Sequence, residues 1–96
     1  MANTAELVET ICKMIGTSPI PLPITFANHG VEEVAGVIDA VVERCGRDGI
    51  GLTRVIIDPK LAEELGLIEG LVLPHGSRPT IHCELGLGRQ VRFQRG

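Results

Sequence analysis

Apolar and polar positions follow two different periods along this chain, and the changes from one period to the other delimit the expected elements. Over residues 1–16, apolar residues recur every three to four positions with charged residues between them, and this spacing predicts an amphipathic helix. Asn3 and Glu6 have the spacing of a capping box at its start, and Gly16 is expected to end it.

Residues 24–66 are expected to form a strand, a helix, a second strand and a short second helix. Parallel neighbours need a connection of a dozen or more residues, so we expect the two strands to lie side by side, joined by a right-handed crossover through the long helix. Asp58 and Pro59 predict the N-cap and first position of the short helix, and Gly66 is expected to end it.

Two segments lack a regular period. Residues 17–23 hold three prolines at alternate positions and are expected to form an extended strap. Pro23 has no N–H to donate, which indicates that the first strand either begins late or has its N–H side unpaired at this position. Residues 67–79 are a loop by composition, within which residues 71–73 are expected to form a short strand or a buried tether.

The last segment, residues 80–95, alternates with a period of two and predicts a β-hairpin. A three-residue loop with Gly88 in the left-handed position keeps every apolar side chain of the hairpin on one face. On the other face, Glu84 is expected to lie diagonally opposite Arg92. The final strand is a candidate sheet edge that could accept a strand from a second copy.

These elements predict one α/β (α+β) domain, in which an N-terminal helix precedes a βαβαββ unit. We expect a single mixed sheet of about four strands, with helices mainly on one face. The expected core residues are Leu7, Ile11, Ile24, Phe26, Val34, Ile38, Val41, Val55, Ile57, Leu61, Ile81, Cys83, Val91 and Phe93.

Composition and charge restrict the function classes. Aromatic residues make up only 2% of the chain, which weighs against aromatic platforms for base stacking. Up to Gly70 there are eleven acidic and five basic residues, whereas from Leu71 onward there are one acidic and four basic residues. This asymmetry could steer an acidic partner to the C-terminal part or let two copies associate head to tail; the alternative is an ordinary solvated surface.

The cysteines and the N-terminus bear on location. Cys12, Cys45 and Cys83 are odd in number, far apart and set in apolar pattern, which indicates buried free thiols in a reducing compartment. The chain has no leader pattern and no apolar run near the roughly 18 residues that suggest a membrane span. We therefore expect a cytoplasmic protein without a membrane partner.

One candidate site lies where the parallel strands end. Asn28, His29 and Gly30 follow the first strand, and Asp58 follows the second. Ligands and anions gather at such strand ends, so these residues could form a ligand-binding rim, with His29 as a base and Asp58 as its orienting carboxylate. The alternative is that Asp58 and Asn28 or Gly30 cap helices and that His29 is a surface side chain.

A second candidate surface is basic. Arg78, Arg89, Arg92 and Arg95 gather around the last strand and could track a phosphate backbone such as that of RNA. An isoelectric point near 5.5 weighs against this interpretation, because salt-sensitive binding usually needs a denser basic patch.

Metal or cofactor chemistry has little support. The histidines and cysteines lack ligand spacing, the cysteines lie on apolar faces where a thiol is inert, and no glycine-rich phosphate loop is present. We therefore expect no cofactor. The hypothesis that remains strongest is a small non-enzymatic interaction module that binds another protein or a second copy of itself as a homodimer.

Overall fold

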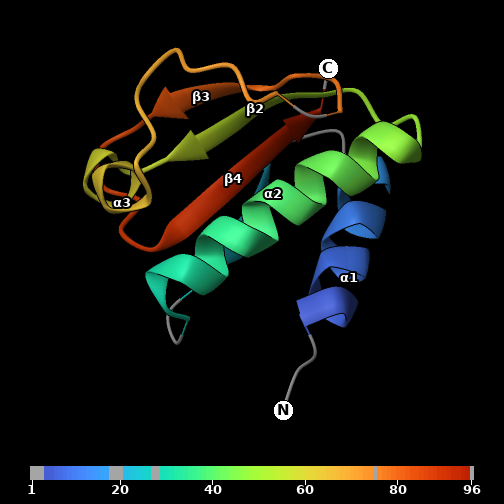
Figure 1. Cartoon of the computed structure of the whole chain (residues 1–96), viewed down its shortest axis with the longest axis horizontal. Coiled ribbons are helices and arrows are strands. Elements are labelled where there is room, and N and C mark those ends of the chain that lie inside the picture. The colour runs from blue at the N-terminus through green and yellow to red at the C-terminus, as the bar shows by residue number, and fades with distance from the viewer. Residues whose placement is uncertain (1–3, 18–20, 27–28, 75, 96) are drawn as a thin grey trace.

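The computed structural model describes residues 4–17, 21–26, 29–74 and 76–95. Its elements occur in the predicted order, and the chain is an α+β fold with three helices and a four-stranded mixed sheet (Figure 1). Asn3 of the expected capping box lies outside the described residues. The elements are α1 (Thr4–Thr17), β1 (Leu22–Thr25), α2 (Val31–Arg47), β2 (Leu52–Ile57), α3 (Pro59–Leu65), β3 (Thr80–Cys83) and β4 (Gln90–Arg95).

The strand order is β1-β4-β2-β3, which corrects the expectation that β1 and β2 are neighbours. Both pair antiparallel with β4, so they do run parallel to each other, but β4 lies between them. The sequence pattern indicates that a helix returns the chain in the same direction. It does not specify how many strand positions the 17-residue α2 crosses.

The predicted hairpin over residues 80–95 is also wrong. β3 pairs parallel with β2, and β2 separates it from β4, so β3 and β4 share no ladder. β4 is an inner strand and cannot accept a strand from a second copy. The alternation was correct within the two strands, since Ile81, Val91 and Phe93 are buried, but Leu85 lies beyond β3 and is 84% exposed. Gly88 is left-handed as predicted, with a φ of 60°. A period of two fixes which face a residue occupies but not which strand lies beside it.

The two edges of the sheet are protected in different ways. The free side of β3 is covered by the segment before it, because Ile81 N–H donates to the Leu71 carbonyl at 2.7 Å. At the other edge, Phe26 N–H donates inward to the Arg89 carbonyl of the segment leading into β4, at 3.0 Å. Successive N–H groups along a strand point to opposite sides, so the nitrogen of Pro23, three residues before Phe26, points away from β4. A proline at this position therefore removes no hydrogen bond of the sheet.

Helices α1 and α2 cover one face of the sheet (Figure 1). The side chains between them and the strands form the core, which includes Phe26 and Phe93 as its largest members. Of the predicted core residues, Leu7, Ile24 and Cys83 are only partly buried and the rest are buried. Helix α1 continues through Gly16 to Thr17, so Gly16 does not end it as predicted.

Candidate functional site

Asp58 connects the end of β2 to the loop that precedes β4. Its Oδ1 atom accepts a hydrogen bond from Lys60 N–H at 2.9 Å, as expected of an N-cap. Its Oδ2 atom accepts from Gly86 N–H and Gly88 N–H, each at 3.2 Å. These backbone donors, that of Lys60 foremost, lower the pKa of the Asp58 carboxyl. The carboxylate is therefore held as an acceptor within the fold.

Arg89 lies between the ends of β1 and β2. Its Nε–H donates to the Phe26 carbonyl at 3.0 Å, and one of its terminal nitrogens donates to the His29 carbonyl. The guanidinium is also 3.9 Å from Glu64 of α3. Arg89 thus joins the segment before α2 to α3, and this arrangement exists because β4 begins between the two parallel strands.

His29 is placed near Arg89 but is not joined to Asp58. Its ring meets Phe26 edge-on, with centroids 5.5 Å apart, and its Nε2 lies 3.7 Å from a Glu33 oxygen. The Nδ1 atom is buried without a partner in the described part of the chain. No hydrogen bond or ion pair among the described residues joins His29 to Asp58. The structure therefore does not assemble them as a base and its orienting carboxylate.

The other two rim candidates contribute little chemistry. Gly30 is the N-cap of α2 and has no side chain with which to cap it. Asn28 lies outside the described residues. The interpretation of this region as a ligand-binding rim stays a prediction.

The face of the sheet opposite the helices carries polar and basic side chains. Arg92, on the central strand β4, lies 3.3 Å from Glu84 and donates to Gln90 at 3.1 Å, so the predicted pairing with Glu84 is present. Ile56, the register partner of both Arg92 and His82, is only 8% exposed. Among the described elements, no helix covers this face, which we call the uncovered face (Figure 1). Its side chains come from Pro23, Thr25, Arg54, Ile56, Thr80, His82, Gln90, Arg92 and Gln94.

Three arginines lie near one end of the sheet. Arg54 of β2 is on the uncovered face with its register partners Thr80 and Gln94, and Arg78 stands two residues before Thr80. Arg95 is the register partner of the core residue Leu52, so it belongs to the opposite face at the same end. All three arginines are exposed, and none forms an ion pair within the described part of the chain. We call Arg54, Arg78 and Arg95 the arginine end.

A hollow of about 300 Å³ adjoins the arginine end. Its lining includes Arg54, Thr80, Glu69 and His82. Glu69 is engaged there, because one of its oxygens lies 3.1 Å from His82 Nδ1 and the other accepts from Cys83 N–H at 2.6 Å. The hollow is therefore basic at the Arg54 side, where no internal carboxylate in the described chain pairs with the guanidinium.

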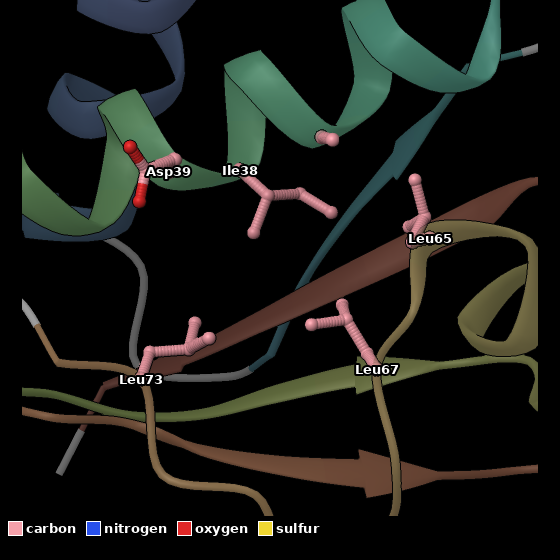
Figure 2. A pocket seen from close by; sticks show the side chains of 6 residues that line it. Ile38, Asp39, Leu65, Leu67 and Leu73 are labelled. Carbon is pink, nitrogen blue, oxygen red and sulfur yellow. The ribbon is translucent and has the colours of Figure 1, made fainter.

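A separate apolar pocket of about 120 Å³ lies on the helical side of the sheet (Figure 2). Ile38 of α2, Leu65 of α3 and Leu67 and Leu73 of the following loop point into the same space. Asp39 is the titratable residue among the described residues that line it, so the pocket offers mainly shape and apolar surface.

Two of the three cysteines lie together in the core. Cys12 and Cys45 are buried, with their sulfurs 3.7 Å apart between α1 and α2. Burial raises the pKa of the Cys45 thiol to about 12. Within the described residues, no group of three His, Cys, Asp or Glu side chains is arranged to hold a metal ion. No helix among them has the length and apolarity needed to cross a bilayer.

Sequence reasoning found part of the arginine end. Arg78 and Arg95 were candidates, whereas Arg54 was not, because its place beside them depends on β4 pairing with β2. Arg89 and Arg92 were candidates too, but internal partners engage both. Comparisons of the chain with family models, with curated proteins and with solved structures found no match.

Proposed function

We propose that this protein is a non-enzymatic binding module that holds an acidic protein surface against the arginine end and the adjoining uncovered face. The observation that supports this most is that three exposed arginines lie near one end of the sheet and that, among the described residues, none of them has an internal ion-pair partner. An unpaired cluster of guanidinium groups is suited to carboxylates, which it binds through two parallel N–H donors.

The geometry of the strand-end rim favours binding over catalysis. Asp58 accepts three backbone hydrogen bonds, and Arg89 donates to two backbone carbonyls. Groups engaged in this way hold loops together and are poorly placed to move a proton to or from a substrate. The arginine end has no comparable internal engagement in the described chain.

A protein partner fits the surface better than a nucleic acid does. Base stacking requires exposed aromatic side chains, and the two aromatic residues of the chain, Phe26 and Phe93, are both buried. The uncovered face instead offers hydroxyl, amide and imidazole groups next to the arginines, which suits a polar protein interface with a charged rim.

Retention of proteins from a cell extract tests the proposal. We would compare the wild-type chain with R54Q/R78Q/R95Q and with the matched variant K13Q/R44Q/K60Q, which removes the same charge from helices. We expect at least one protein to be retained by the wild type and the matched variant but not by the arginine-end variant. Equal retention by both variants would show that the arginine end is not the binding surface.

Nucleic-acid binding is the second candidate, because the four strands hold three arginines and no acidic residue. Fluorescence anisotropy with a labelled random single-stranded RNA pool tests it. Phosphate binding predicts an affinity that falls with salt and a salt dependence that becomes shallower in R54Q/R78Q/R95Q. Binding that is absent at low salt, or unchanged in this variant, would contradict it.

A further inference from the structure

Acidic side chains gather at the end of the molecule opposite the arginines. Glu32 and Glu33 lie in the first turn of α2, and Glu63 and Glu64 lie in α3. Arg89 places these two helices together, because it contacts both His29, just before α2, and Glu64. We call Glu32, Glu33, Glu63 and Glu64 the acidic end.

The two ends are separated along the sheet. Strand β2 starts at the arginine end, and α3 follows its other terminus (Figure 1). In Figure 1, α3 and the start of α2 are on the left, and the C-terminus and the start of β2 are on the right. The molecule extends 33 Å along its longest axis, whereas charges in physiological salt are screened beyond about 8 Å. The ends therefore cannot neutralise each other within one copy.

Both ends keep charges without an internal partner. At the acidic end, Glu33 lies 3.7 Å from His29 and Glu64 lies 3.9 Å from Arg89. Glu32 and Glu63 are exposed, and neither forms an ion pair in the described part of the chain. The arginine end thus presents unpaired guanidinium groups, and the acidic end presents unpaired carboxylates next to the exposed Lys60 of α3, so the dominant charges of the two ends are complementary.

We infer that the acidic surface bound by the arginine end is the acidic end of a second copy of this chain. The inference rests on the proposed function, since it names the partner of that same surface. Contacts of this kind are head-to-tail, so a pair of copies still has one arginine end and one acidic end that are free. Association therefore continues to chains or closes into a ring, instead of stopping at a two-fold dimer.

Sedimentation velocity of the purified protein at several concentrations provides the first test. At low ionic strength, we expect the weight-average sedimentation coefficient to rise with concentration, and we expect 0.5 M salt to return it to that of the monomer. A wild-type protein that stays monomeric across the series at low salt overturns the inference.

Charge reversal at each end provides the second test. R54E/R78E/R95E removes the arginine end, and E32K/E33K/E63K removes the acidic end, and we expect each change to weaken self-association at least about tenfold. Mixed together, the first variant carries carboxylates at both ends and the second carries cations at both ends, so unlike variants are complementary at each end. The mixture should therefore regain the concentration-dependent association that each variant alone has lost.

A matched variant and the outcomes complete the design. E6K/E9K/E43K changes the net charge as much as the acidic-end variant does, but on α1 and the C-terminal part of α2, and it should associate like the wild type. Circular dichroism establishes that each variant is folded. Association that persists in both end variants, or a mixture that stays monomeric, overturns the inference. The proposed function stands separately if a monomeric wild type still retains an extract protein through the arginine end.

Discussion

Asp58 Oδ2 accepts a hydrogen bond from Gly88 N–H at 3.2 Å, and this contact ties the end of β2 to the loop that leads into β4. The two residues are far apart in sequence, but they meet because β4 is inserted beside β2. One carboxylate thus caps α3 and also fixes the loop at the start of the central strand.

Replacing Asp58 by Asn should lower stability and remove part of its pH dependence. The Asn side chain is uncharged and has a single acceptor oxygen, so it cannot replace both carboxylate oxygens as acceptors for the N–H groups of Lys60, Gly86 and Gly88. Both the helix cap and the loop are therefore weakened. The folded pKa of Asp58 lies below the ordinary 3.8, so its contribution is present above that value and is lost as the pH falls through the folded pKa. Urea unfolding between pH 2 and 7 measures this. Wild type and D58N should differ near neutrality and converge in acid, and a constant difference would contradict the assignment.

Gly46 and Gly36 both lie in α2, and alanine should have opposite effects at the two positions. A methyl group on Gly46 would overlap the backbone of Gly76, whereas nothing lies within 4 Å of one on Gly36. The free energy of unfolding of G46A should be lower by roughly 1–3 kcal/mol or more, because the backbone cannot move aside as a flexible side chain can. The free energy of unfolding of G36A should be higher by about 0.5–1 kcal/mol, because alanine has a higher helix propensity than glycine. Chemical unfolding of both variants measures the difference. A G46A protein as stable as G36A would show that the backbones of Gly46 and Gly76 are not in close contact.

Cys45 should be nearly inert in the folded protein. With a pKa of about 12, only about one thiol in ten thousand is ionised at pH 8, and the side chain is also fully buried. An aromatic disulfide reagent should therefore label the half-buried Cys83 first and reach Cys12 and Cys45 only after denaturant is added. C83S should lack the first phase. Rapid labelling of two thiols in native C83S would contradict the packing of α1 on α2.

The sequence allowed the elements, their order and their buried faces to be predicted, but not the strand order. The apolar alternation of Ile81 and Phe93 is the same whether β3 pairs with β4 or with β2, since either arrangement buries both side chains. Adjacency depends on contacts between distant segments, such as that of Asp58 with Gly88. The arginine end was therefore only partly predicted, because Arg54 joins it through the pairing of β2 with β4.

Amide hydrogen exchange tests the strand order directly. As an inner strand, β4 has hydrogen-bonded neighbours on both sides, so its amides from Val91 to Gln94 should all exchange slowly. In β1, the edge strand, Ile24 N–H faces β4 and Thr25 N–H faces outward, so Thr25 should exchange at least about a hundredfold faster. Two-dimensional NMR after transfer to D₂O measures each amide. Alternating fast and slow amides along β4 would instead indicate that β4 is an edge strand, and would favour the hairpin predicted from the sequence, in which β3 pairs with β4.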